Sequence, residues 1–392
     1  VIFTKIDHAY EQAQAADKAL ALGKTTGPLH GLPMTIKDSY DWVGSPSTWG
    51  MPEMIDNYPE VNAVAVQRLL DAGAIIYGKS NVPLKLSDWQ SFNEIYGTTN
   101  NPWDPTRTPG GSSGGAAAAL ATGMASLEIG SDIGASIRNP AHFCGVYGHK
   151  PTMGIVPLQG HLLPGDTAYH DISVGGPLAR SAEDLKLTLE ILAGPTGDLR
   201  KAWQFQLPRS RKNKLSEFKV GVLMESPVCT QDEQLTEQLL DTVAALEKAG
   251  VQTDYTADLG FDWHRYWEVY LLLLRATTSA SYTDEEFEFH LQSAAARKPD
   301  DTRYRAYLDK GITIRHRDWW ALHDEREQMR LRWQAFFEHY DLLLCPTAAS
   351  TAFVHDQTGE RPDRTIDING QQELVVDQLF WAGLSGVVYV PS

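Results

Sequence analysis

Serine and glycine are concentrated in one stretch of the chain to an extent that an ordinary core does not need. Residues 108–138 read TPGGSSGGAAAALATGMASLEIGSDIGASIR, with a Gly–Ser segment on each side of a short alanine-rich run. Glycine permits positive φ and close approach of the backbone to a ligand or reacting group. A serine hydroxyl becomes a nucleophile when a base takes its proton. The stretch therefore predicts a site for nucleophilic or anion-binding chemistry.

Three kinds of site could use such a stretch, and the residues argue against two of them. A phosphate-binding P-loop needs a lysine after its glycines, whereas alanines follow here. The nucleophile elbow G-x-S-x-G matches around Ser112 and around Ser113. That motif needs a strand before it and a histidine and an acid after it, and residues 106–109 are not a strand. The third kind is a triad of two serines and a lysine.

The triad is supported by several motifs in a fixed order. GLPMTIKDSYD contains Lys37, GGSSGG contains Ser112 and Ser113, GSDIGASIRNPA contains Ser136, and CGVYGHKPT follows. The separations are 112 − 37 = 75 residues and 136 − 112 = 24 residues. Together with YGTTNNP, GAIIYGKSN and GGPLARSAEDL, these segments resemble the amidase signature family over roughly residues 31–185, and the resemblance implies amide hydrolysis.

The resemblance implies a role for each triad residue. Ser136 would be the nucleophile, Ser112 the proton relay, preceded by a cis peptide bond, and Lys37 the base. Lysine acts as a base only when neutral, and burial lowers its pKa from the usual value of about 10.4. The place of Lys37 at the end of an apolar strand suits such burial. No metal or cofactor is implied.

The loop around Ser136 would supply the remaining parts of the site. The resemblance implies an oxyanion hole built from four backbone N–H groups, those of Ile133, Gly134, Ala135 and Ser136. Ala135 stands where glycine is usual in the family, and a positive φ there would be strained. Ser113 would be a supporting hydrogen-bond partner. Asp132 and Arg138 would form an ion pair that shapes the loop.

The elements that must position these residues alternate between strand-like and helix-like segments. Apolar runs predict strands at residues 32–36, 74–77, 218–224, 251–255 and 341–345, and helical spacing predicts helices at 61–72 and 234–248, with another opening at 116–120. This alternation predicts an α/β fold. The resemblance implies the amidase signature fold, a central mixed β-sheet covered by helices on both faces. We expect one domain, 1–392, with a signature core at about 28–195.

A variable region at about 225–340 is expected to be mostly helical from residue 263 onward. Trp263, Tyr266 and Trp267 recur at helical spacing and share one helix face. They predict either core packing or an aromatic wall of a substrate cleft. The second interpretation favours an apolar or aryl acyl amide as substrate, with carbamates and esters as side activities.

The amino-acid composition limits the kinds of partner that the protein is expected to bind. A net charge of −16 argues against a surface for nucleic-acid phosphates, and no apolar run of the length of a membrane span occurs. Three scattered cysteines favour a reducing cytoplasm, although the chain begins at Val1 and an export signal would not be visible. We expect a small amide as the ligand and a monomer or homodimer.

Two features near the ends depart from the family pattern. Lys37 lies close to the N-terminus, which predicts a short or missing N-terminal helical segment. LFWAGLSGVVYVPS, residues 379–392, resembles the family's late strand region and ends where another strand is expected, which predicts an incomplete sheet. Two rival functions stay open. One is the A subunit of a glutamine-dependent tRNA amidotransferase, which needs partner subunits, and the other is an inactive scaffold.

Overall fold

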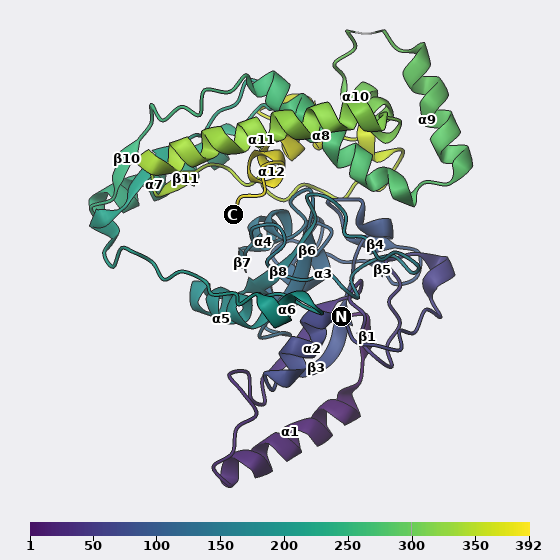
Figure 1. Ribbon diagram of the computed structural model, residues 1–392, viewed down its shortest axis with the longest axis vertical. Coiled ribbons are helices and arrows are strands. Elements are labelled where there is room, and N and C mark those ends of the chain that lie inside the picture. The colour runs from purple at the N-terminus through teal and green to yellow at the C-terminus, as the bar shows by residue number, and fades with distance from the viewer. Residues whose placement is uncertain (299) are drawn as a thin grey trace.

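The computed structural model describes residues 1–298 and 300–392, and its first half alternates short strands with helices (Figure 1). The strands are β1 (Phe3–Thr4), β2 (Pro33–Lys37), β3 (Ile75–Ser80), β4 (Phe92–Asn93), β5 (Gly97–Thr98), β6 (Glu128–Asp132), β7 (Tyr147–Gly148) and β8 (Val174–Ala179). The helices are α1 (Ile6–Ala21), α2 (Val64–Asp71), α3 (Gly114–Ala121), α4 (Arg138–Cys144), α5 (Ala182–Leu192) and α6 (Leu199–Ala202).

The second half is richer in helix. Its helices are α7 (Glu233–Lys248), α8 (Trp263–Thr278), α9 (Asp284–Ala296), α10 (Tyr304–Ile312), α11 (His316–His339) and α12 (Leu379–Gly386). Its strands are β9 (Lys219–Val222), β10 (Gln252–Asp254), β11 (Leu342–Leu344), β12 (Thr365–Ile368) and β13 (Gln371–Leu374). The strands predicted at 32–36, 74–77, 218–224, 251–255 and 341–345 and the helices predicted at 61–72, 116–120 and 234–248 each contain an element of the predicted kind.

The strands pair in several small sheets, of which β1-β3-β2 is mixed, β6-β8-β7 antiparallel and β10-β9-β11 parallel. The orders are β1-β3-β2, β6-β8-β7 and β10-β9-β11, with β4-β5 and β12-β13 as two-stranded pairs. β2 runs parallel to β3, whereas β6 runs antiparallel to β8. Side chains join β2 to β6: Thr35 Oγ1 donates to Glu128 Oε1 and Lys37 Nζ donates to Ser131 Oγ. The first two sheets are thus joined by side-chain contacts where the polar site lies.

One prediction about the ends of the sequence is wrong. At the N-terminal end, a helix of 16 residues, α1, precedes Lys37. Residues 379–386 form the helix α12, where the sequence predicted a late strand region. Every residue of α12 is buried, so its apolar residues show no amphipathic period, and such a short run does not distinguish a buried helix from a buried strand.

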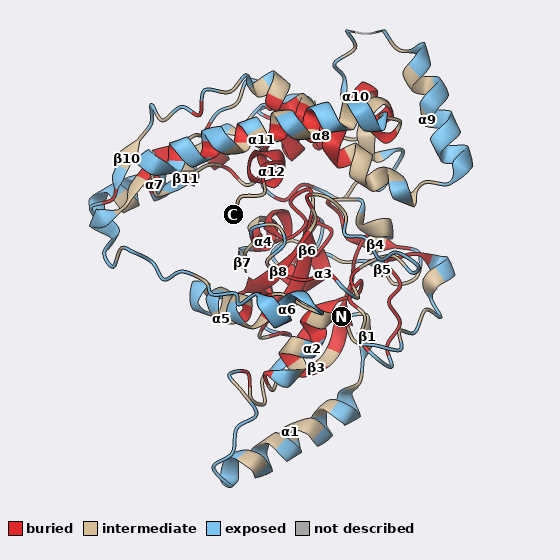
Figure 2. Ribbon diagram, viewed as in Figure 1, coloured by how far each residue is buried: buried red, intermediate tan, exposed pale blue. Residues whose placement is uncertain are grey.

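The buried side chains form more than one cluster. Figure 1 shows α8, α10 and α11 on one side of the molecule, β6 and β8 with α2 and α3 on the other, and α12 between them. Figure 2 shows β6, β8, α12 and much of α8 as buried. In contrast, α1 and α9 have no buried residue. The largest hydrophobic cluster includes residues of α8, α10 and α12, and a separate one includes residues of β2, β3 and α2.

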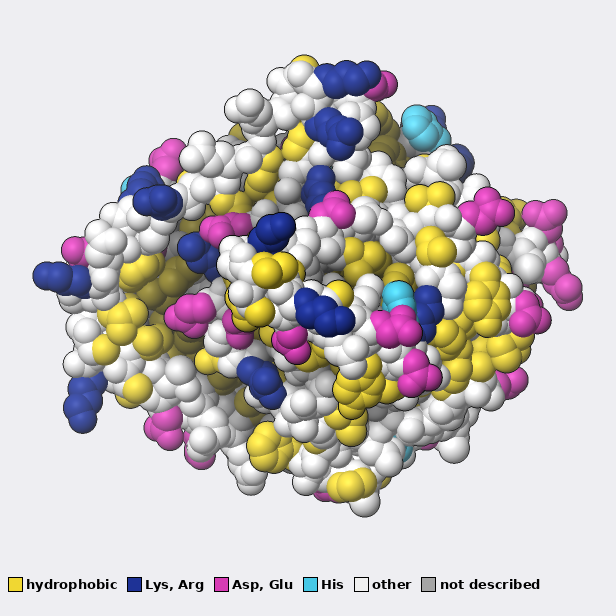
Figure 3. Space-filling model, turned by 90° about the horizontal axis from the view of Figure 1, so that it is seen from below, with side chains coloured by type: hydrophobic (Ala, Val, Ile, Leu, Met, Phe, Trp, Pro, Cys, Tyr) yellow, Lys and Arg dark blue, Asp and Glu magenta, His cyan; other side chains and the backbone are white. Residues whose placement is uncertain are grey.

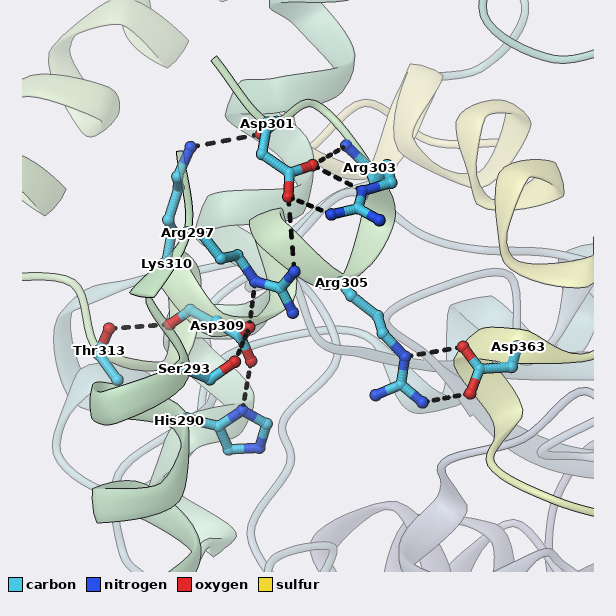
Figure 4. Close-up of polar contacts among 10 residues, drawn as sticks. All are labelled: His290, Ser293, Arg297, Asp301, Arg303, Arg305, Asp309, Lys310, Thr313 and Asp363. Atoms are coloured by element: carbon cyan, nitrogen blue, oxygen red, sulfur yellow. Dashed lines mark hydrogen bonds and ion pairs between the residues drawn. The ribbon is translucent and has the colours of Figure 1, made fainter. Parts of the chain in front are cut away.

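The outlying helix α9 is held to α10 by one buried carboxylate (Figure 4). Asp309 of α10, 3% exposed, accepts hydrogen bonds from Ser293 Oγ at 2.7 Å and Arg297 Nε at 2.5 Å. His290 Nδ1 lies 2.7 Å from the same carboxylate. Polar contacts therefore replace apolar packing as the attachment of α9.

The surface carries charges of both signs. On the face in Figure 3, acidic and basic side chains are interspersed with hydrophobic ones. Among the described residues, no helix combines the length and the apolar character needed to cross a membrane.

Candidate active site

Lys37 lies at the end of β2 with three serine hydroxyls around its amino group. Its Nζ donates to Ser112 Oγ at 2.6 Å, to Ser113 Oγ at 3.0 Å and to Ser131 Oγ at 3.0 Å. Lys37 is 0% exposed. The structure therefore brings together the predicted base, the predicted relay and the predicted supporting serine. Sequence reasoning missed Ser131, although it stands in the GSD part of the second motif.

The amino group of Lys37 has a strongly altered proton affinity. Burial lowers the pKa of Lys37 to about 7, because the interior disfavours the ammonium form. The charges of Asp132, Glu128 and Asp38 act in the opposite direction. A substantial fraction of Lys37 is therefore neutral at pH 7 and able to accept a proton.

The Gly–Ser loop approaches other backbone closely before it enters α3. A Cβ on Gly111 would lie 2.2 Å from Asp88 O, and one on Gly115 would lie 2.3 Å from Asn81 N. No side chain fits at either position, which explains these glycines. The Gly111–Ser112 peptide bond is cis, as the resemblance implied.

Ser136 lies on the loop between β6 and α4, beside the Gly–Ser loop. Ser113 N donates to Ser136 O at 3.1 Å, which joins the two loops. Ser136 is 6% exposed. Among the residues that the structure describes, its hydroxyl makes no hydrogen bond. Ser136 thus adjoins the Lys37 cluster through its backbone, with its hydroxyl unengaged.

The predicted ion pair between Asp132 and Arg138 is present and is buried. Arg138 Nη2 lies 2.8 Å from Asp132 Oδ1, and Arg138 Nε lies 3.0 Å from Asp132 Oδ2. Burial alone would raise the pKa of Asp132, but the guanidinium and backbone N–H donors more than offset it, and that pKa is lowered. Asp132 also accepts from Ala135 N and Ile137 N, both at 3.0 Å. The carboxylate therefore fixes the curvature of the loop.

One of the four N–H groups predicted for the oxyanion hole already has an acceptor in the protein. Ala135 N–H donates to Asp132 Oδ1 at 3.0 Å. In the described part of the chain, the N–H groups of Ile133, Gly134 and Ser136 donate to no protein acceptor. Ala135 has φ of 67°, in the left-handed region where glycine is favoured.

Two carbonyl groups of the same loop accept hydrogen bonds from buried side chains. Trp89 Nε1 donates to Gly134 O at 2.8 Å, and Tyr270 Oη donates to Ile133 O at 3.4 Å. Both side chains are buried, and Tyr270 belongs to α8. These two residues were missed by sequence reasoning, since neither stands in a signature motif.

The aromatic residues expected at the cleft are placed in the core instead. Tyr266 is 1% exposed and donates to Leu384 O at 2.8 Å. Trp267 is buried, and Trp263 is partly buried, and both pack against Phe380 of α12. The helical spacing of these three residues therefore reflects packing in the core, which was the first of the two interpretations. The expectation that these residues line a cleft is corrected.

Comparison with known proteins gives consistent matches along the chain. The family model Amidase matches residues 1–382. The chain is 30% identical over 383 residues to indoleacetamide hydrolase from Bradyrhizobium diazoefficiens, covering 96% of this chain and 68% of that protein. It is 31% identical over 382 residues to the A subunit of glutamyl-tRNA(Gln) amidotransferase from Picosynechococcus sp., covering 91% of this chain and 76% of that protein.

The solved structures agree with the predicted fold class. An amidase crystal structure superimposes with a TM-score of 0.76 at 26% identity, covering all of this chain and 82% of the other. This confirms the amidase signature fold. The chain therefore belongs to the amidase signature family, whose members hydrolyse the C–N bonds of amides.

Proposed function

We propose that the protein hydrolyses a small amide with an apolar or aryl acyl group, using Ser136 as nucleophile, Ser112 as relay and Lys37 as base. The observation that carries the proposal is the 2.6 Å contact between Lys37 Nζ and Ser112 Oγ inside a closed interior. A neutral amine at that distance can take the hydroxyl proton. The same hydroxyl can then take the proton of Ser136.

The reaction has two steps. In the first, Ser136 Oγ attacks the amide carbonyl while its proton passes through Ser112 to Lys37. The proton then returns along the same path to the leaving amine, and an acyl-enzyme remains. In the second, water attacks the carbonyl of the acyl-enzyme while the same relay takes its proton, and that proton returns to Ser136 Oγ as the acid product leaves. Among the described residues the Ser136 hydroxyl has no hydrogen bond that would compete with one to Ser112, and the backbone bond from Ser113 N to Ser136 O keeps the two loops together.

The negative charge formed on the carbonyl oxygen needs donors that are already in place. The free N–H groups of Ile133, Gly134 and Ser136 are the candidates, with their loop held by Trp89 and Tyr270. Removing one such donor typically lowers turnover by about 10²–10³-fold. Because Ala135 N–H is engaged by Asp132, we assign it a structural part.

The substrate class is supported by similarity and by the burial of Ser136. Indoleacetamide hydrolase acts on indoleacetamide by its name, an amide that carries an aromatic ring, and this chain is 30% identical to it. Ser136 is 6% exposed. Such burial suits a small substrate, which can reach the serine without bringing bulk water with it. Carbamates and esters present the same carbonyl to Ser136 and are proposed as side activities.

A second candidate is the role of an amidotransferase A subunit, which the 31% identity to such a protein supports. That role requires glutamine as the amide and partner subunits for the full reaction. Hydrolysis of an aryl amide by the isolated chain, with no release of ammonia from glutamine, would favour the first candidate.

The deciding experiment combines covalent labelling with an amide panel. We expect a fluorophosphonate to add one label to the wild type and none to Ser136→Ala, measured by intact mass. We expect Ser112→Ala and Lys37→Ala to lose roughly 10³-fold or more in kcat/KM on the best amide. Ser216→Ala is the control, since Ser216 is an exposed serine outside the site.

The outcomes separate cleanly. Labelling that persists in Ser136→Ala would move the nucleophile to another serine and end the proposal. Full amidase activity in Lys37→Ala would exclude Lys37 as the base. Absence of labelling and of hydrolysis across the panel in the wild type would favour the inactive scaffold.

A further inference from the structure

One buried carboxyl group beside the serine–lysine cluster has no part in the steps above. Glu128, the first residue of β6, is 0% exposed. Its Oε1 accepts a hydrogen bond from Thr35 Oγ1 at 2.5 Å. Its Oε2 has no hydrogen-bond partner among the described residues. An ionised carboxylate in such surroundings is costly, so its presence calls for a function.

The backbone places Glu128 and Lys37 on the same pair of neighbouring strands. Thr35, the partner of Glu128, precedes Lys37 by two residues on β2, and residues two apart on a strand face the same side. Ser131, which accepts from Lys37, follows Glu128 by three residues on β6. Two side-chain contacts thus join β2 to β6 in the interior, one made by the carboxyl group of Glu128 and the other by the amine of Lys37.

Other charged groups face Lys37, and each has its own partner. Asp132, at the end of β6, is paired with Arg138. Asp38, next on the chain, accepts from Thr48 and Trp49 and feels the charge of Lys79. His161 lies within electrostatic reach from the loop after β7, and burial keeps it neutral by lowering its pKa to about 3.

Glu128 itself is faced by Tyr40, Tyr77 and the amino group of Val1, besides Lys37. Within residues 1–298 and 300–392, no lysine or arginine forms a hydrogen bond or ion pair with its carboxyl group. Glu128 is therefore a carboxyl group near Lys37 that has, in the described part of the chain, a single side-chain hydrogen bond, from Thr35, and no lysine or arginine in contact.

The two groups titrate over the same range. Burial raises the pKa of Glu128 to about 7, and the hydrogen bond from Thr35 opposes that rise. Burial lowers the pKa of Lys37 to about 7. Because an ionised Glu128 favours the ammonium form of Lys37 and a protonated Glu128 favours the neutral amine, the protons of the pair are coupled.

We propose that Glu128 is a positioning residue that sets the proton affinity of Lys37, and through it the pH at which the amidase becomes active. The inference rests on the proposed function of Lys37. Ionised Glu128 holds the proton on the lysine, so the free base forms at a higher pH than it would beside a neutral group. In this role Glu128 touches neither the substrate nor the reacting atoms.

The test is the pH dependence of kcat/KM between pH 5 and 9 for the wild type and for Glu128→Gln. Glutamine removes the charge and keeps an oxygen that can accept from Thr35. We expect the acid limb of the profile to move to lower pH by roughly one pH unit, with the plateau within a few-fold of wild type. An acid limb that is absent from the wild type, unchanged in the variant, or moved to higher pH would overturn the proposal.

A second variant covers the case in which Glu128→Gln does not fold. Thr35→Val removes the hydrogen bond that favours the ionised carboxylate, so Glu128 stays protonated to higher pH. Lys37 then loses its proton more readily, and the acid limb should again move to lower pH. An unmoved limb in a folded Thr35→Val protein would count against the proposal in the same way.

Two controls distinguish a change in the proton affinity of Lys37 from a general loss of stability and from a failure of the proposed function. Asp309→Asn removes a different buried carboxylate, on α10, and should lower the melting temperature while leaving the acid limb in place (Figure 4). Lys37→Ala tests the proposed function alone. If Lys37→Ala is inactive and Glu128→Gln keeps the wild-type limb, only the role of Glu128 fails. If Lys37→Ala stays active, the proposed function fails.

Discussion

At the scale of single residues, the environment of Lys37 explains how a lysine can be a base near neutral pH. Its hydrogen-bond partners are the hydroxyls of Ser112, Ser113 and Ser131. In the described part of the structure, Lys37 forms no ion pair. Hydroxyl groups accept a hydrogen bond from the neutral amine as well as from the ammonium, whereas a carboxylate in contact would hold the charged form. Burial therefore prevails and the neutral amine is accessible.

This environment predicts how stability depends on pH. The pKa of Lys37 is about 7 when folded and about 10.4 in an unfolded chain. Between these values the unfolded chain binds a proton that the folded protein does not, so the free energy of unfolding rises with pH. From pH 7 to 9 the wild type should gain about 2 kcal/mol relative to Lys37→Met, measured by urea unfolding at each pH.

The matched control is Lys248→Met, at an exposed lysine at the end of α7. Its unfolding free energy should follow the wild type at both pH values. A difference between wild type and Lys37→Met that stays constant from pH 7 to 9 would mean that Lys37 keeps its proton in the folded protein. The proposed base would then be excluded.

At the scale of elements, the loop carrying Ser136 is held by a helix from the other half of the chain. Tyr270 of α8 donates to Ile133 O, and α12 packs against the ring of Tyr270. The close point is Gly383, where a Cβ would lie 2.4 Å from the Tyr270 ring. The approach of α12 to α8 thus positions the donor that holds the loop.

Two glycines of α12 give a matched test of this packing. Gly383→Ala forces the helices apart, and we expect a loss of about 1–3 kcal/mol in unfolding free energy together with a fall in kcat. Gly386→Ala places its Cβ 3.8 Å from Ile172 Cγ2, which is ordinary contact, and should leave stability within about 1 kcal/mol. Urea unfolding and amide hydrolysis measure both. Equal effects of the two changes would show that Tyr270 does not limit the approach.

Motifs predicted the residues that carry chemistry better than the residues that support them. Lys37, Ser112 and Ser113 meet as expected because the amidase signature contains all three. Glu128, Trp89 and Tyr270 were not predicted, since their partners lie 93, 45 and 137 residues away in the chain. Such contacts arise from the packing of distant elements, which no local pattern reports.

Local sequence patterns also failed to predict two elements outside the site. The hairpin β12–β13 was missed, although Asn369–Gly370 is a turn signal and both residues have positive φ. β12 does alternate, with Ile366 and Ile368 buried between exposed polar residues, but it has only four residues and its partner β13 is mainly polar, so the alternation is too short to stand out. The prediction of a strand region at residues 379–386 was wrong because every residue of helix α12 is buried, so its sequence shows no helical alternation of apolar and polar residues.

At the scale of the whole molecule, one arginine joins the two halves of the chain. Arg138 of α4 pairs with Asp132 and also donates to Ala382 O at 3.1 Å and Ser385 Oγ at 2.9 Å on α12. The same side chain therefore shapes the loop of Ser136 and fastens α12 over it. We propose on this basis that residues 1–392 unfold as one domain.

Arg138→Met tests that proposal, because it leaves Asp132 charged and buried without its partner. We expect a loss of about 3–5 kcal/mol in unfolding free energy, a cost typical of breaking a buried ion pair from one side. Asp132→Asn combined with Arg138→Met should cost less than the sum of the single changes, because both charges are then removed. The wild type should unfold in one transition when followed both by tryptophan fluorescence and by loss of amidase activity. Two separate transitions in the wild type would divide the chain into two domains, and additive costs would show that Asp132 and Arg138 do not act as a pair.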